Sequence, residues 1–167
     1  MYIEFRTDFF ERLKKVNNPV FMRRLVNRSG VVAVNFSKER FVKKDWLDGS
    51  SREKWKERKR RDRGSLMVKS GRLKRSIRKL SQGDYFVYVG TDVPYAQIHN
   101  EGGEVNKTAN VRAHNRTRQA RTERVKAHRR KMKFTMPKRQ FLGDSDALAK
   151  RIERFAIREI DNEIQRL

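Results

Sequence analysis

Three histidines, His99, His114 and His128, are the residues best suited to metal or acid–base chemistry in this chain of 167 residues. His99 is followed by Asn100 and Glu101, an order of residues that could suit a metal-dependent nuclease. One histidine beside one carboxylate is weak support for that hypothesis, and the other two histidines stand among arginines, which repel cations. We therefore expect no catalytic residue, metal site or cofactor. We expect His99 to be a turn residue whose ring hydrogen-bonds the backbone at a strand end.

Other kinds of active site find no support in the sequence. The chain has no cysteine, which excludes disulfides, thiolate zinc sites and cysteine nucleophiles. Neither Gly90 alone nor the pair Gly102-Gly103 has the spacing of a phosphate-binding loop. Ser70 and Ser76 have no basic catalytic partner beside them in sequence. We expect a protein that is not an enzyme.

No apolar run approaches the roughly 20 residues that a membrane-spanning helix requires, so we expect no membrane partner. Charged residues interrupt the apolar residues of the first 15 positions, unlike in a signal peptide. Together with the absence of cysteine, this pattern fits synthesis in the cytoplasm.

Positive charge is concentrated in two segments. The chain has 43 Lys and Arg against 20 Asp and Glu, a net charge of +23. Residues 52–79 contain 14 basic and 3 acidic residues, and residues 107–139 contain 13 basic residues and 1 acidic residue. All other residues together are neutral, so two basic segments are attached to an electrically balanced body. Such segments bind polyanions in a salt-dependent manner, although a solvated basic arm without a fixed partner has the same composition.

Residues 104–133 contain no aromatic side chain, so stacking on nucleic acid bases is not expected there. Contacts with a polyanion would be made through charge alone. The candidate contacts are Arg112, Arg116, Arg118, Arg121, Arg124, Lys126, Arg129, Arg130 and Lys131.

Apolar spacing predicts helices at both ends of the chain. Residues 1–16 carry one apolar face, and Asn18-Pro19 is a typical start for a second helix, which we extend to about Lys43. Ser145 is expected to cap a C-terminal helix with an apolar stripe. That stripe could belong to the core or to a subunit interface. It comprises Leu148, Ile152, Phe155, Ile160, Ile164 and Leu167.

The middle of the chain is expected to combine a loop, a short helix and strands. Residues 45–64 are predicted to be a basic loop that Trp46 and Trp55 attach to the core. Ser70 is predicted to cap a short helix that runs to Leu80, residues 81–84 form a turn, and residues 85–91 form a strand. The segment after Pro94 is expected to be a half-buried strand.

Residues 104–136 contain a small repeat, VRAH at 111–114 and VKAH at 125–128. The repeat fits a long basic β-hairpin, and the low apolar content fits a disordered arm nearly as well. We predict a single α+β domain over residues 1–167, with long N-terminal and C-terminal helices packed on a small antiparallel sheet. The basic loop 45–64 and the basic arm or hairpin 104–136 are attached to it.

Three ordered segments resemble a family of phage proteins. They are SGRLKRSI at 70–77, VGTDVPYAQIHNEGG at 89–103 and MPKRQFLG at 136–143. This order resembles the phage virion morphogenesis family, the tail-completion proteins of Mu-like and related tailed phages. The chain departs from the pattern at Glu101, where an apolar residue is common, and at Gln140, where proline is common. The matching residues are Ser70, Gly71, Leu73, Ile77, Gly90, Pro94, Tyr95, His99, Gly102, Gly103, Pro137, Phe141, Leu142 and Gly143.

The resemblance implies a structural virion protein of the neck or tail, made in the host cytoplasm. It implies a homo-oligomeric ring, typically hexameric, that joins the tail tube or its terminator to the head-completion proteins. The implied partners are those neighbouring phage proteins and, through the basic segments, genomic DNA in the channel. The alternative function from the charge alone is a basic nucleic-acid-binding protein that is not part of the virion.

Overall fold

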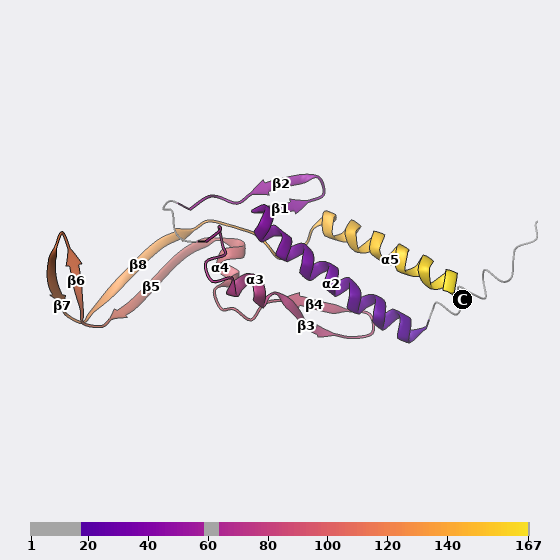
Figure 1. Ribbon diagram of the computed structural model, residues 1–167, viewed down its shortest axis with the longest axis horizontal. Coiled ribbons are helices and arrows are strands. Elements are labelled where there is room, and N and C mark those ends of the chain that lie inside the picture. The colour runs from indigo at the N-terminus through magenta and orange to yellow at the C-terminus, as the bar shows by residue number, and fades with distance from the viewer. Residues whose placement is uncertain (1–17, 59–63, 167) are drawn as a thin grey trace, which may run out of the picture.

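The computed structural model describes residues 18–58 and 64–166 and shows an α+β architecture, as predicted (Figure 1). Its described strands pair antiparallel in four two-stranded sheets, instead of the one small sheet that was expected. The elements are α2 (Pro19–Lys43), β1 (Asp45–Asp48), β2 (Ser51–Lys54), α3 (Arg72–Ser76), β3 (Arg78–Gln82), β4 (Val87–Gly90), α4 (Ala96–Glu101), β5 (Gly103–Val111), β6 (His114–Arg118), β7 (Arg121–Val125), β8 (His128–Met136) and α5 (Asp146–Arg166).

Helix α2 is the long predicted helix. The side chain of Asn18 accepts a hydrogen bond from the amide of Val20 at 2.8 Å, and Pro19 occupies the first turn, where a missing amide hydrogen is harmless. The helix ends at Lys43, and the next residue, Lys44, caps it: its backbone is left-handed (φ 57°) and its amide donates to the carbonyl of Arg40 at 2.7 Å. The predicted limits of this helix are therefore confirmed, whereas the helix predicted over residues 1–16 lies outside the described residues.

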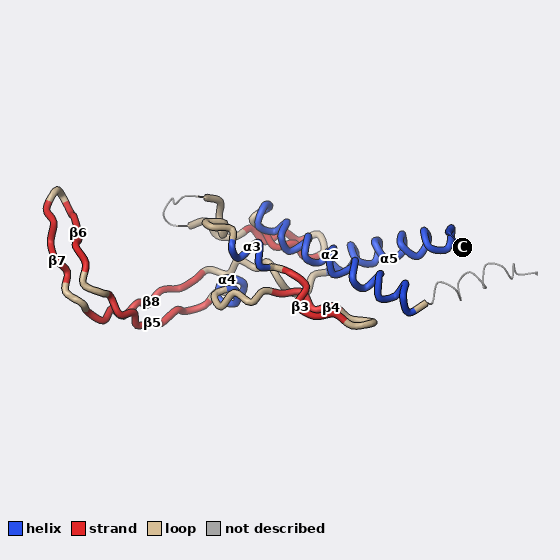
Figure 2. Tube along the Cα trace, turned by 60° about the horizontal axis from the view of Figure 1, so that its bottom comes forward, coloured by secondary structure: helices blue, strands red, loops and turns tan. Residues whose placement is uncertain are grey.

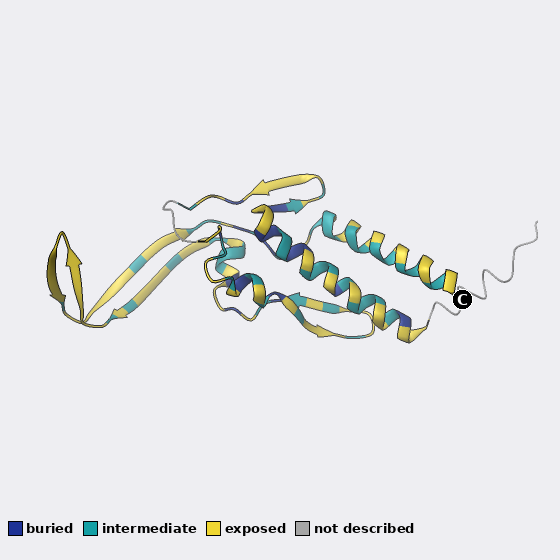
Figure 3. Cartoon of the chain, viewed as in Figure 1, coloured by how far each residue is buried: buried dark blue, intermediate teal, exposed yellow. Residues whose placement is uncertain are grey.

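Helix α5 runs antiparallel to α2. Ser145 caps it as predicted, because its hydroxyl accepts from the amide of Leu148 at 3.2 Å. Arg151 pairs with Glu39 of α2 at 2.7 Å. No described residue of α5 is fully buried (Figure 3). The described part of the apolar stripe is only half-buried within the subunit, and Leu167 lies outside the described residues; the half-buried members are Leu148, Ile152, Phe155, Ile160 and Ile164.

The core lies where α2 meets the middle of the chain. Phe41 of α2 contacts Trp55 edge-on, with ring centroids 5.4 Å apart, and Phe141 at 5.0 Å. Aromatic pairs of this geometry add to the gain from buried area. The cluster comprises Phe41, Trp55, Leu66, Leu73, Ile77, Val93, Ala96 and Phe141.

The predicted basic loop at 45–64 is wrong in its first half, which is the β1–β2 hairpin. The two strands pair from Asp45 with Lys54 to Asp48 with Ser51, around a turn at Gly49. All four residues of β2 are exposed, so its sequence lacks the alternation that indicates a strand. The expected attachment by Trp46 and Trp55 is confirmed, since both indoles are buried.

Three local predictions in the next segment also need correction. Helix α3 ends at Ser76, and Leu80 lies instead in β3, which pairs with β4 in a hairpin packed on α2. Ser81 and Gln82 complete β3 and are not part of a turn. The segment after Pro94 is a short helix, α4, and not a strand.

Residues 103–136 form a long hairpin that projects away from the body (Figures 1 and 2). Its proximal part, β5–β8, pairs from Gly103 with Met136 to Val111 with His128, and its tip is β6–β7. Of the two alternatives for this segment, the structure has the hairpin. We refer to residues 103–136 as the arm.

The repeated tetrapeptide lies at the bend between the two parts of the arm. Val111 pairs with His128, and His114 pairs with Val125, so the two copies face one another. Each histidine donates from Nδ1 to the carbonyl two residues earlier, at 3.0 Å to Arg112 and 2.9 Å to Lys126. The repeat therefore marks matching bends in the two strands.

Candidate assembly site: the arm and its anchor

The three motif segments of the sequence analysis come together around the core. Leu73 and Ile77 from the first segment and Phe141 from the third are buried in one cluster with Val93 and Ala96 from the second. Polar contacts join the segments as well. The hydroxyls of Ser76 and Thr91 lie 2.6 Å apart, for example. The motif therefore acts as a joint between segments that are distant in sequence.

Asn100 is the centre of this joint. Its side-chain oxygen accepts from the amides of Phe141 and Leu142, both at 2.9 Å, and its side-chain nitrogen donates to the carbonyl of Leu142 at 3.0 Å. Residues 141–142 pair with no neighbouring strand among the described elements, and the side-chain amide of Asn100 supplies the hydrogen bonds that such a strand would make with their backbone. Since α4 leads into β5 and residues 137–143 follow β8, this one side chain ties together the two roots of the arm.

Further bonds hold the two roots to each other and to the residues that follow β2. The amide of Arg139 donates to the carbonyl of His99 at 2.9 Å, and its guanidinium donates to the carbonyl of Lys56 at 2.9 Å. The indole of Trp55 donates to the carbonyl of Gln140 at 2.9 Å. Gly102 has φ +75°, and a Cβ there would lie 2.7 Å from the amide nitrogen of Lys138. Only glycine lets the two roots approach so closely.

The remaining motif residues shape turns around the joint. Gly71 has φ +73° at the start of α3, and Gly143 has φ +144° before α5. Gly90 is buried, and a Cβ at its position would lie 2.8 Å from the side chain of Leu80. Ser70 accepts weakly from the amide of Arg72 at 3.4 Å, so Gly71 and not Ser70 is the residue that begins the helix. The others lie in or beside α4 and the third segment: Pro94, Tyr95, Gly103, Pro137 and Leu142.

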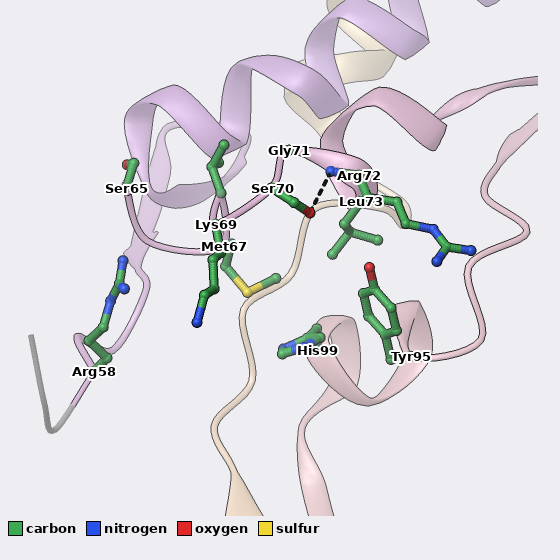
Figure 4. Close-up of a pocket in the computed structure, with 11 residues that line it drawn as sticks. Arg58, Ser65, Met67, Lys69, Ser70, Gly71, Arg72, Leu73, Tyr95 and His99 are labelled. Carbon is green, nitrogen blue, oxygen red and sulfur yellow. Dashed lines mark hydrogen bonds between the residues drawn. The ribbon is translucent and has the colours of Figure 1, made fainter. Parts of the chain in front are cut away.

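His99 lies in α4 and not in a turn, which corrects the prediction for its ring. Its Nδ1 is buried without a hydrogen-bond partner among the described residues, and its ring meets that of Tyr95 edge-on at 5.8 Å. The two side chains border a cavity of about 200 Å³ beneath the loop that carries Met67 and Ser70 (Figure 4). Burial lowers the pKa of the His99 imidazole, and the nearby Arg139 guanidinium lowers this pKa further.

The surroundings of His99 do not support the nuclease hypothesis. Glu101 follows it by two positions on α4, a spacing that does not place side chains on the same helix face. Glu101 instead accepts from Gln97 at 3.2 Å. Within residues 18–58 and 64–166, no three His, Asp or Glu side chains group as metal ligands would.

The nine candidate polyanion contacts are all exposed on the arm, where the structure brings them into one ribbon. At its tip Arg118 pairs directly with Arg121, and like charges in such a cross-strand pair destabilise a hairpin. The turn between them places Gln119 (φ 48°) and Ala120 (φ 63°) in the left-handed region, which disfavours both residue types. A bound anion between the two arginines would relieve the repulsion.

Sequence reasoning missed the roles of Asn100 and Arg139. Both belong to the quoted motif segments, yet neither stands out there as a site residue. A partial signal was present for Asn100, since an amide side chain two positions before a glycine pair is suited to bonding backbone groups, although it does not identify which ones. The buried Arg139 gave no comparable signal.

Comparison with known proteins supports the motif interpretation. The sequence model of the phage virion morphogenesis family matches residues 10–161. No curated protein and no solved structure matches the chain. No described helix is long and apolar enough to cross a membrane.

Replacing Asn100 should loosen the joint. We expect Asn100→Ala to lower the free energy of unfolding by about 2–4 kcal/mol, because two amides and a carbonyl lose their partner. Asn100→Asp should cost less, since its carboxylate still accepts from both amides. Urea denaturation checks this, with the exposed arm variant Asn106→Ala as the control. Equal stability of the Asn100→Ala and Asn106→Ala proteins would contradict the proposed role.

The lowered pKa of His99 predicts acid sensitivity. The unfolded chain binds a proton at His99 near the ordinary pKa of about 6.5, whereas the folded chain binds it only at lower pH. Stability therefore falls as the pH drops through that range. We expect the loss of unfolding free energy between pH 8 and pH 5 to be smaller in His99→Gln than in the unmodified protein. An identical pH dependence of the His99→Gln protein and the unmodified protein would refute the expectation.

Proposed function

The chain belongs to the phage virion morphogenesis family, and from this premise we propose that it is a tail-completion protein that forms a ring at the head–tail junction. The family membership establishes a role in virion assembly. The ring, the position in the neck and the copy number, typically six, belong to the proposal. The observation that carries it is the arm, which is held at both roots by the family motif and extends away from the body.

The shape of the chain suits such a role. A ring of identical subunits needs a different contact surface on each flank of the subunit. The partly covered stripe of α5 offers one apolar surface, and the projecting arm can reach past the neighbouring subunit. The neighbours of the ring would be head-completion proteins on one side and the tail tube or its terminator on the other.

The arm offers a positively charged surface for binding an anionic neighbour. Its exposed arginines and lysines would bind an anionic neighbour, either DNA in the channel or an acidic ring. The second candidate function is a basic nucleic-acid-binding protein outside the virion, favoured by the net charge of +23. The two functions differ in where the protein is found after assembly.

Depletion of the protein tests the proposal. We expect phage lacking this chain to accumulate filled heads and separate tails, because the joint between them is missing. Mass spectrometry of purified normal particles should detect the chain at about six copies per particle, with the portal protein as the counting standard. If complete infectious particles assemble without the chain, the tail-completion function is excluded and the nucleic-acid-binding function is favoured.

The tip charges should contribute to polyanion binding. Loss of two phosphate contacts lowers the slope of log affinity against log salt by about 2 for duplex DNA. We expect this change for the purified full-length Arg118→Gln/Arg121→Gln protein. The control variant Lys150→Gln/Arg154→Gln removes the same charge from exposed positions of α5, outside both basic segments, and should leave the slope unchanged. Equal slopes for the two double variants would show that the tip does not contact DNA phosphates, and an acidic protein would then be the better candidate.

A further inference from the structure

The two faces of the proximal arm differ in chemistry. Paired residues of an antiparallel ribbon share a face, and successive residues alternate between faces. From the pairing of Val105 with Phe134, one face of β5–β8 can be assigned, and we call it the arm face. Its apolar residues are Val105, Ala109, Val111, Met132, Phe134 and Met136, with Lys107, His128 and Arg130 among them. The opposite face carries Glu104, Asn106, Thr108, Asn110, Arg129, Lys131, Lys133 and Thr135.

Burial agrees with this assignment. Every partly buried residue of β5 and β8 lies on the arm face, and Phe134 on the same face is still 45% exposed. Strands β5 and β8 pack almost entirely on each other among the described elements. A two-stranded ribbon with one uncovered apolar face is at best marginally stable in water. The arm face therefore requires a cover that the subunit does not supply.

The same chain exposes a second apolar surface on the β3–β4 hairpin. One side of this hairpin packs on α2, where Val87 closely approaches Gly30. The other side exposes Tyr88 by 63% and Phe86 by 49%, with ring centroids 5.2 Å apart. We call this surface, formed by Leu80, Tyr85, Phe86 and Tyr88, the aromatic face.

Resting on the ring proposed above, we infer that the arm face of one subunit docks on the aromatic face of the next. The arm projects at one end of the molecule, and the β3–β4 hairpin lies beside α2, on the side of α3 away from the arm (Figures 1 and 2). A subunit cannot cover its own aromatic face with an arm that points away from it. Contact between unlike surfaces of successive copies is the arrangement that closes a ring.

Charge repulsion favours docking of the arm face on the body of a neighbouring subunit over docking on another arm. Two arms packed face to face would bring together two segments that each contain 13 basic residues and 1 acidic residue over 107–139. Residues 78–92, which contain the aromatic face, have two basic and two acidic residues, so this part of a second copy repels the arm less than another arm does. Face-to-face packing of two antiparallel ribbons is also an ordinary way to bury apolar side chains.

The contact between the arm face and the aromatic face is too small to form on its own in dilute solution. Nine-residue strands span about 30 Å, and a ribbon two strands wide offers far less than the roughly 800 Å² per partner of a stable interface. Docking of the arm therefore supplements the other contacts between subunits in the assembled ring. It is expected in particles and not in dilute solution.

Docking also fixes the direction of the cationic side chains. With the arm face covered, Arg129, Lys131 and Lys133 point away from the neighbouring subunit and toward anionic material. Arg130 shares the covered face, although it adjoins Arg129 and Lys131 in sequence. The candidate polyanion contacts of β8 thus divide into two sets with different surroundings.

Because the natural chain has no cysteine, cross-linking can test the contact directly. Copies carrying Phe134→Cys and copies carrying Tyr88→Cys are produced together during phage assembly, and purified particles are oxidised. We expect a disulfide-linked dimer of one copy of each kind. Lys133→Cys, adjacent in sequence but on the opposite face, replaces Phe134→Cys in the matched control and should yield at least fivefold less dimer.

Each other result overturns the inference. Equal dimer yields for Phe134→Cys and Lys133→Cys would show that the arm face is not directed at the aromatic face. Dimers of Phe134→Cys with itself would show that arms pack together, and a link to a different phage protein would identify another occupant. If particles contain the ring but lack the cross-link, the docking inference fails while the tail-completion function stands. If particles lack the chain, the function itself fails.

Discussion

The structure depends on one constraint, the fixing of both roots of the arm to the core. Asn100 bonds the backbone of Phe141 and Leu142, and the amide of Arg139 bonds the carbonyl of His99. These contacts join the end of α4 to the segment that follows β8. A hairpin held at only one root would sample many directions, whereas one held at both roots leaves the body in a single direction.

The arm itself has features that favour its completion by a partner. Its tip sets Arg118 against Arg121 across a turn of two residues with left-handed backbone, and its proximal part leaves one apolar face uncovered. A bound anion would relieve the repulsion at the tip, and a protein surface would cover the arm face. In the assembly proposed above, the apolar surfaces would make the contacts between subunits and the cationic arm would attract negative charge.

The long elements could be predicted from sequence because their ends carry specific chemistry. Asn18-Pro19 and Ser145 are strong helix starts. Both are confirmed, because the side chains of Asn18 and Ser145 each accept a hydrogen bond from a backbone amide in the first turn of the helix. Strand β2 was missed because all its side chains are exposed and no alternation remains. Helix α4 was mistaken for a strand because six residues are too few to separate the two periodicities. The bonding partners of Asn100 could not be predicted, since they lie about 40 positions away and meet it only in the fold.

The measurement that tests the account most directly is an electron cryomicroscopy reconstruction of the intact particle. We expect density for this chain as a closed ring at the head–tail junction. Within it, the side of the arm that carries Val105 and Phe134 should rest against protein, and the side with Arg129 and Lys131 should face negative charge. A ring in which Val105 and Phe134 face solvent, or a particle without this chain at the junction, would contradict it.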